Sequence, residues 1–181
     1  MKRIIYFLLL AFSAVVNAAV DTTPQQNVDF RKYAGRWYEQ ARFENWFEEG
    51  MEHVYTDYTL LQNGSLRVSN HGTSPQGYAE QATGRAFIVA PGELSVSFVW
   101  PYWWFRAPYK VLYIDSEYQS ALVSGEDATY LWLLTREPVP ASRMLKNLVE
   151  QAKLRGFDTS SLRYTKHQNR KSTAPDTKMP G

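Results

Sequence analysis

The sequence predicts an all-β protein, an eight-stranded up-and-down antiparallel β-barrel with one C-terminal α-helix packed outside it. Between Arg36 and Arg136, short stretches rich in Val, Tyr, Trp, Phe and Thr alternate with Gly, Pro, Asn and Asp roughly every ten residues, a rhythm typical of antiparallel barrels and sandwiches. An amphipathic helical pattern follows the last stretch. The length of 181 residues suits one domain with a substantial core.

The strands are expected at residues 36–43, 54–61, 65–72, 80–90, 93–100, 109–115, 118–124 and 129–136. The Asn63-Gly64 pair predicts a tight hairpin between the second and third strands, because both residues tolerate a positive φ. Turns at Pro91-Gly92 and Ser116-Glu117 are expected at the same end of the barrel. Closing the sheet removes its edges and leaves an interior able to hold one small ligand.

The helix is expected after Pro138 and Pro140, which end the last strand. Ser142 is the predicted N-cap, and the helix runs to about Arg155, with Gly156 after its end. Apolar residues spaced by three and four positions form one stripe at Leu145, Leu148, Val149 and Ala152. This stripe is expected to lie against the outside of the sheet.

Both ends of the chain are expected to lie outside the domain. Lys2 and Arg3 precede an apolar run at 4–16, and Ala18 ends a small-residue cleavage site. Because the run is shorter than the roughly 20 residues of a membrane span, residues 1–18 are predicted to be a cleaved signal peptide. The barrel and helix then occupy 19–164, and the polar residues 165–181 form a mobile tail.

Charge and composition exclude several classes of function. Lys2 and Arg3 belong to the leader, so the remaining 18 Lys and Arg balance the 18 Asp and Glu, and no basic face is left for nucleic acid. The chain has no cysteine, which excludes disulfides, thiolate metal sites and a cysteine lipid anchor. The three histidines, His53, His71 and His167, lack ligand spacing and are expected at the surface. We therefore expect no metal and no cofactor.

Three short motifs in order along the chain carry a family resemblance. Gly35-Arg36-Trp37-Tyr38, the turn at 115–118 and Thr135-Arg136 resemble the signature regions of lipocalins. Residues 35–43, 96–101 and 130–136 look most like the bacterial outer-membrane lipocalins and apolipoprotein D. The resemblance implies a lipid-binding cup and, in bacteria, a link to envelope maintenance. Many bacterial members carry an anchoring cysteine that this chain lacks, so a soluble periplasmic protein is expected in preference to outer-membrane association.

The resemblance also implies roles for three signature residues. In lipocalins the tryptophan closes the base of the barrel and the arginine of the last strand lies across its ring. Trp37 and Arg136 match these positions, and with Gly35 they are expected to be structural and not ligand contacts. The turns near Trp37 then mark the closed end, and the loops 44–53, 73–79, 101–108 and 125–128 form the mouth.

Strand alternation predicts the lining of the cup, because successive side chains point to opposite faces. The expected ligand-contacting residues on the strands are Glu39, Ala41, Phe43, Tyr58, Asn70, Val96, Phe98, Trp100, Tyr109, Val111, Tyr113, Tyr130 and Trp132. In the mouth loop, Trp103 and Trp104 are added. Small residues at Ala41, Gly84 and Ala86 favour an open interior. The mouth aromatics, which include Trp46 and Phe47, serve as a lid, a membrane contact or the interface of a homodimer.

These expectations point to a carrier or store for a fatty acid or lysophospholipid, since each buried methylene contributes about 0.8 kcal/mol. A lipid-acting hydrolase or isomerase is the first alternative, and a tetrapyrrole carrier is the second. The chain has no Gly-x-Ser-x-Gly motif and no inward histidine in the expected register. No catalytic residue is therefore predicted, and the protein is expected not to be an enzyme.

Overall fold

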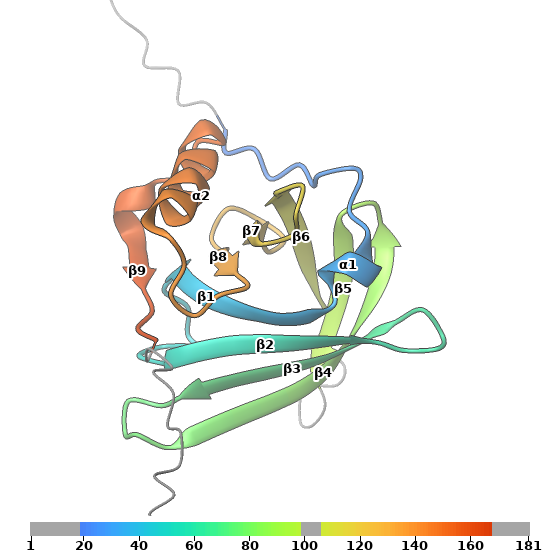
Figure 1. Cartoon of the computed structure of the whole chain (residues 1–181), viewed down its shortest axis with the longest axis horizontal. Coiled ribbons are helices and arrows are strands. Elements are labelled where there is room, and N and C mark those ends of the chain that lie inside the picture. The colour runs from blue at the N-terminus through green and yellow to red at the C-terminus, as the bar shows by residue number, and fades with distance from the viewer. Residues whose placement is uncertain (1–18, 99–105, 168–181) are drawn as a thin grey trace, which may run out of the picture.

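The computed structural model describes residues 19–98 and 106–167, and it confirms the predicted barrel with one helix outside (Figure 1). The barrel strands are β1 (Gly35–Phe43), β2 (Glu52–Leu60), β3 (Leu66–Thr73), β4 (Ala79–Ala90), β5 (Glu93–Phe98), β6 (Arg106–Ile114), β7 (Ser120–Ser124) and β8 (Leu131–Thr135). Consecutive strands pair antiparallel, and β1 closes the barrel by pairing with both β2 and β8. The predicted signal peptide at 1–18 lies outside the described residues.

Three short elements lie outside the predicted set: α1 (Phe30–Tyr33), the 3₁₀ helix η1 (Thr159–Ser161) and β9 (Leu162–Tyr164). The helix α1 begins after Asp29, whose carboxylate accepts a hydrogen bond from the Arg31 N–H at 2.9 Å, as an N-cap side chain does. It lies toward the same end of the barrel as the turn between β2 and β3 (Figure 1).

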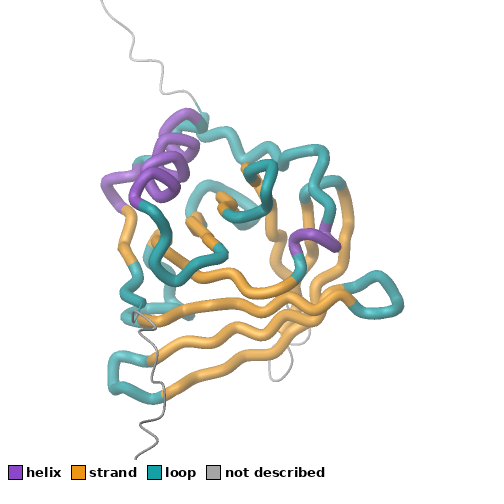
Figure 2. The backbone as a smooth tube through the Cα atoms, viewed as in Figure 1, coloured by secondary structure: helices purple, strands orange, loops and turns teal. Residues whose placement is uncertain are grey.

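The long helix α2 (Ser142–Leu154) packs outside the barrel against β7 and β8 (Figure 2). Gly156 follows its end with φ of 87°, and the Phe157 N–H returns to the Ala152 carbonyl at 3.1 Å, which confirms the predicted stop. The predicted N-cap at Ser142 is wrong. Ala141 occupies the cap position, so Ser142 is already helical and its side chain caps no N–H group.

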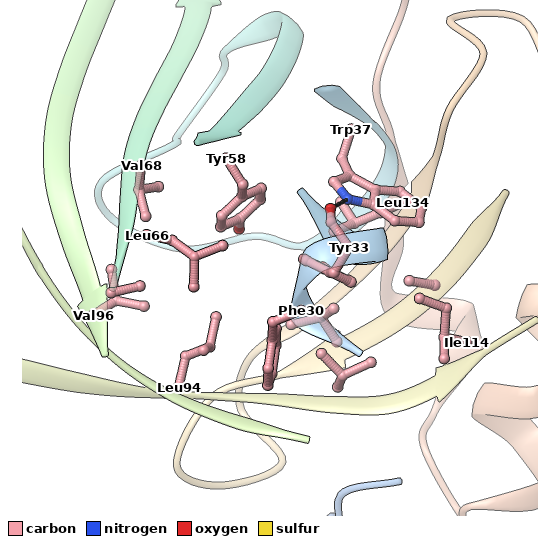
Figure 3. Packing of buried hydrophobic residues seen from close by; sticks show 14 residues of the cluster. Phe30, Tyr33, Trp37, Tyr58, Leu66, Val68, Leu94, Val96, Ile114 and Leu134 are labelled. Atoms are coloured by element: carbon pink, nitrogen blue, oxygen red, sulfur yellow. Dashed lines mark hydrogen bonds between the residues drawn. The ribbon is translucent and has the colours of Figure 1, made fainter. Parts of the chain in front are cut away.

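Apolar side chains form two separate cores. One fills the barrel near α1, where Phe30, Tyr33 and Trp37 pack with Leu66 and Leu94 (Figure 3). The other lies between the barrel and α2, and it gathers residues that point out of the barrel, namely Ala41, Leu112, Leu122, Leu131, Leu133, Leu148, Ala152, Phe157 and Leu162. A residue's membership in one core or the other therefore shows which face of the sheet it occupies.

Bulges in β1 and β6 change the alternation of side chains within these two strands. The register of β1 shifts between Glu39 and Ala41, and that of β6 shifts between Val111 and Tyr113. A bulge adds one residue to a strand, so every side chain beyond it moves to the opposite face. In both strands, residues beyond the bulge that regular alternation would place inside the barrel therefore point outward.

The C-terminal end of β1, from Ala41 to Phe43, does not pair with β2. Residues 162–166 lie in the gap between the two strands. β9 pairs with this half of β1, and the Thr165 N–H donates to the Gln40 carbonyl at 3.0 Å. The His53 N–H of β2 donates to the Lys166 carbonyl, also at 3.0 Å. The tail predicted from residue 165 is thus wrong for its first residues, and 168–181 lie outside the described part of the chain.

Candidate functional site

The closed end of the barrel is built on the Trp37 ring, which is fully buried. The guanidinium carbon of Arg136 lies 3.8 Å from the ring centroid, as the resemblance of the signature motifs implied. The Trp37 indole N–H donates to the Tyr33 carbonyl at 2.8 Å. Arg136 also donates to the backbone carbonyls of Lys32, Tyr33, Ala34, Arg36 and Tyr118. This arginine ties α1, β1 and the β6–β7 turn together at one point.

Gly35 belongs to the same corner. Its φ is 103°, and a Cβ placed on it would lie 3.2 Å from Nη1 of Arg136. Any larger residue would be strained in its backbone and crowd the arginine. The three signature residues therefore meet in space at the closed end.

A cluster of three tyrosines lies above this base. The Tyr33 and Tyr109 hydroxyls are 2.5 Å apart, and the Tyr58 ring centroid lies 5.4 Å from that of Tyr33 and 6.1 Å from that of Tyr109. Burial raises the pKa of all three hydroxyls, so they remain neutral donors and acceptors at neutral pH. Tyr33 comes from α1, which the strand pattern does not reveal, so the sequence prediction missed it.

Most predicted strand residues do lie on the interior side. Tyr58, Val96 and Val111 belong to the interior core, and Phe98, Tyr109 and Trp132 pack against it. Asn70 shares the face of Val68, and its side chain accepts a hydrogen bond from the Thr56 hydroxyl at 2.9 Å. Phe98, Tyr109 and Trp132 are only partly buried, whereas Trp37, Leu66 and Leu94 at the base are fully buried. The interior is packed at its base and more open above it.

Three predicted lining residues instead point outward, and the bulges are the reason. Ala41 and Phe43 follow the bulge of β1 and pack in the core beneath α2, where the Phe43 and Phe157 rings lie 6.1 Å apart. Tyr113 follows the bulge of β6, and its hydroxyl accepts from the Asn147 side chain of α2 at 3.0 Å. The inward orientation predicted for Ala41, Phe43 and Tyr113 is therefore wrong.

The small residue Gly84 and the three predicted tryptophans near the mouth remain to be placed. Gly84 was expected to give the interior room, but a Cβ on it would lie 2.5 Å from the Ser97 carbonyl oxygen. The glycine instead permits close approach of β4 and β5. Trp100, Trp103 and Trp104 lie outside the described residues.

A buried, hydrogen-bonded pair of ionisable side chains lies beside the mouth. Nη1 of Arg42 donates to Oε1 of Glu39 at 2.6 Å, and the two side chains are 0% and 3% exposed. The Thr165 hydroxyl also donates to Glu39 at 2.5 Å. Burial, followed by the charge of Glu48, raises the pKa of Glu39 to about 8 against the attraction of Arg42. Glu39 was expected inside, but Arg42 was not predicted, because strict alternation places it outside.

Arg42 also anchors the loop between β1 and β2. Its Nη2 donates to the Glu48 carbonyl at 2.5 Å and to the Glu44 carboxylate at 3.2 Å, and both of its terminal nitrogens contact the Met51 carbonyl at 3.4 Å. The loop is thereby held against the barrel wall.

Aromatic rings continue from the interior to the rim of the mouth. The Trp132 ring stacks on Tyr130 with centroids 5.8 Å apart, and Tyr130 stacks on Phe47 at 6.1 Å. Trp46 packs edge-on against Phe47 at 5.5 Å and is 74% exposed. The Glu48 carboxylate accepts from the Trp132 indole N–H at 3.0 Å. Glu48 was not among the predicted site residues.

The histidines lie outside the aromatic stack, although Nε2 of His167 lies 2.6 Å from the Glu39 carbonyl oxygen. His71 stacks on Tyr55 with ring centroids 4.6 Å apart on the outer face of β2 and β3, and the His53 and His167 rings lie 6.3 Å apart. Within residues 19–98 and 106–167, no group of three or more His, Cys, Asp or Glu side chains is arranged to hold a metal ion. No helix in these same ranges is long and apolar enough to cross a membrane.

Comparison with known proteins gives the same fold and family. A family profile described as "Lipocalin-like domain" matches residues 28–167. "Outer membrane lipoprotein Blc" of Escherichia coli K12 is 40% identical over 142 residues, which cover 76% of this chain and 78% of the relative. Mouse "Apolipoprotein D" is 30% identical over 156 residues, 80% of each chain.

Among solved structures, insecticyanin from the tobacco hornworm Manduca sexta superposes with a TM-score of 0.69. The match covers 83% of this chain and 87% of insecticyanin at 17% identity, which shows a shared fold. With the barrel, the signature corner and the profile match together, the chain belongs to the lipocalin family.

Proposed function

We propose that this protein binds a fatty acid or lysophospholipid in the barrel and carries or stores it in the bacterial cell envelope. One observation carries the proposal: Phe98, Tyr109 and Trp132 keep part of their surface exposed above a fully buried base. An acyl chain lying against these residues would gain about 0.8 kcal/mol for each buried methylene. Lysophospholipid and fatty acid share this chain and differ in the head group.

The proposed ligand contacts are the inward residues Glu39, Tyr58, Asn70, Val96, Phe98, Tyr109, Val111, Tyr130 and Trp132, together with Trp100, Trp103 and Trp104. The polar members lie at two levels. Tyr58 and Tyr109 stand near the base, and Glu39 lies beside the mouth with Arg42. A chain entering through the mouth would thus leave its head group near the charged residues and its tail near the tyrosines.

We propose a carrier and not an enzyme, located in the periplasm after removal of residues 1–18. The relative from Escherichia coli is named an outer membrane lipoprotein, which supports an envelope location. Fractionation with N-terminal sequencing tests this placement. Recovery in a detergent-only membrane fraction with the leader intact contradicts it.

Mass spectrometry of an organic extract of the purified mature protein tests the ligand. Co-purified fatty acid or lysophospholipid, and saturable binding of a fluorescent fatty acid by delipidated protein, are the expected results. A visible absorbance band from a tetrapyrrole, or turnover of acyl esters, would replace the lipid carrier by one of the alternatives.

A further inference from the structure

Three arginines form a row across the outer wall of the barrel. Arg67 of β3 stands directly opposite Arg85 of β4. In the same register, Ser97 of β5 separates Arg85 from Arg106 of β6. All three arginine side chains are exposed, and β3 and β4 lie on the side of the barrel away from α2 (Figure 1). Like charges directly opposite each other destabilise a sheet, so the fold alone gives no reason for this arginine row.

The side chain at the end of the row turns back toward the other two. The guanidinium carbon of Arg106 lies 5.5 Å from the centroid of the Phe87 ring, although β5 separates the two residues. Phe87 and Arg85 share the outer face of β4, because Ala86 between them belongs to the interior core. The positive charges of three strands are therefore concentrated beside β4.

Nearby acids do not neutralise this charge. No ion pair found among residues 19–98 and 106–167 includes any of the three arginines. Asp57 and Glu93 lie on the same outer face, but Asp57 pairs with Arg36 at 2.8 Å and Glu93 stands opposite Lys110 in the register. The arginine row thus presents guanidinium groups to solvent, and the planar fork of such groups matches the oxygens of a phosphate.

Exposed aliphatic side chains adjoin the arginine row at the closed end of the barrel. Ile88 and Val89 follow Phe87 on β4 and are 48% and 56% exposed, and Leu60 at the end of β2 is 39% exposed. These three residues, the aliphatic edge, line one groove beside residues 26–31. Aliphatic groups next to cations are typical of surfaces that rest on a lipid bilayer, where the cations meet anionic head groups and the aliphatic groups leave water.

We propose that the arginine row and the aliphatic edge form a docking surface for an anionic phospholipid bilayer. The guanidinium groups bind lipid phosphates, and the aliphatic side chains enter the head-group region. A free phosphate is a poorer partner, because it would leave the aliphatic edge in water. The mouth loop at 44–51 precedes β2, whereas Leu60 ends that strand, so docking leaves the mouth open.

Flotation of the purified protein with vesicles tests the docking surface. Vesicles of phosphatidylcholine alone are compared with vesicles that also contain phosphatidylglycerol, each at low and at high NaCl. Wild type should bind the anionic vesicles in preference, and salt should weaken this binding because it screens the charges. Replacing the row together, with Arg67→Gln, Arg85→Gln and Arg106→Gln, should weaken binding to anionic vesicles by about tenfold or more.

A matched control removes the same charge from another face. Arg143→Gln, Lys146→Gln and Lys153→Gln change three exposed cations of α2, and this variant should bind anionic vesicles as wild type does. Because the arginine row contains a like-charged pair, its replacement should not lower the melting temperature. Titration with a fluorescent fatty acid should be the same in both triple variants, since neither touches the cup.

The aliphatic edge has its own variant. Ile88→Ser together with Val89→Ser should reduce the part of the vesicle binding that persists at high salt, because this part depends on apolar contact. Both side chains are exposed, so the melting temperature should change little.

Several results would overturn the proposal. An equal loss in the α2 variant would reduce the effect to net charge, and equal binding of wild type to neutral and anionic vesicles would remove the role of the arginines. Displacement from vesicles by inorganic phosphate, but not by NaCl of equal ionic strength, would identify a site for a free anion. Vesicle binding that survives loss of the arginine row but not Trp46→Ser would place the membrane contact at the mouth.

Discussion

Oε1 of Glu39 accepts a hydrogen bond from Nη1 of Arg42 at 2.6 Å, although the two residues lie only three positions apart on a strand. In a regular strand such residues point to opposite faces. The bulge between Glu39 and Ala41 brings them to the same side. The pair therefore exists because the strand is irregular.

Stability should fall with rising pH because of Glu39. Burial raises its pKa from 4.5 to about 8, so the folded state favours the protonated acid. The resulting contribution to the free energy of unfolding is fully present below pH 4.5 and is lost as the pH rises through about 8. Urea unfolding across this window should show the decline, and Glu39→Gln should flatten it. An identical slope in wild type and Glu39→Gln contradicts the assignment.

Replacing Arg136 with Ala should lower stability by about 2 kcal/mol or more, because the cation–π contact and several hydrogen bonds to carbonyls are lost together. Arg36→Ala is a suitable comparison. The guanidinium carbon of Arg36 lies 4.0 Å from the Tyr55 ring centroid, and Arg36 pairs with Asp57 at the surface. Removing this side chain should therefore lower the free energy of unfolding by roughly 1 kcal/mol or less. Chemical denaturation measures both. Loss of lipid binding at unchanged stability in Arg136→Ala would show a ligand role instead.

The two faces of the barrel should separate stability from binding. Phe43→Ala empties space beneath α2 and should cost about 3 kcal/mol of stability while affinity for a fatty acid stays the same. Phe98→Ala, on the interior side, should weaken fatty-acid binding severalfold because chain contacts are lost. Denaturation and fluorescence titration on both variants give the comparison. An affinity loss in Phe43→Ala equal to that of Phe98→Ala is incompatible with the outward position of Phe43.

Replacing Trp46 with Ser should speed release of a bound fatty acid severalfold, because the ring covers Phe47 at the rim and a cover acts on the escape step. Melting should change little, since Trp46 is mostly exposed. Stopped-flow displacement measures the rate. Unchanged release, accompanied by weaker vesicle binding or by a shift from dimer to monomer, would assign the aromatic rim to a membrane contact or to a subunit interface.

The barrel could be predicted from the sequence because its turns and β-rich stretches are local signals. The interior face could be predicted only as far as the alternation stays regular. Tyr58, Val96 and Phe98 follow it, whereas Ala41, Phe43 and Tyr113 lie beyond bulges. No residue type in β1 or β6 marks these bulges, because they arise from the curvature that the sheet needs in order to close into a barrel.

Charged residues at the mouth were missed for a related reason. Glu48 lies in a loop, where no period relates sequence to direction, and its orientation depends on Asn45 and Trp132. Tyr33 was missed because α1 is a single turn, too short for a helical pattern. Its one local signal is Asp29 as an N-cap. The part of the site on regular strands could thus be predicted, and the parts beyond the bulges, in the loops and on α1 could not.

The segment from Leu162 to Lys166, which fills the gap between β1 and β2, has a consequence for how the chain folds. Strand β1 leaves a ribosome or a translocation channel long before residues 162–166, which supply its final neighbours. Contacts over such sequence distances make folding slow, because the loop between them must be ordered first. Strand β1 therefore cannot complete its hydrogen bonds until residues 162–166 have emerged.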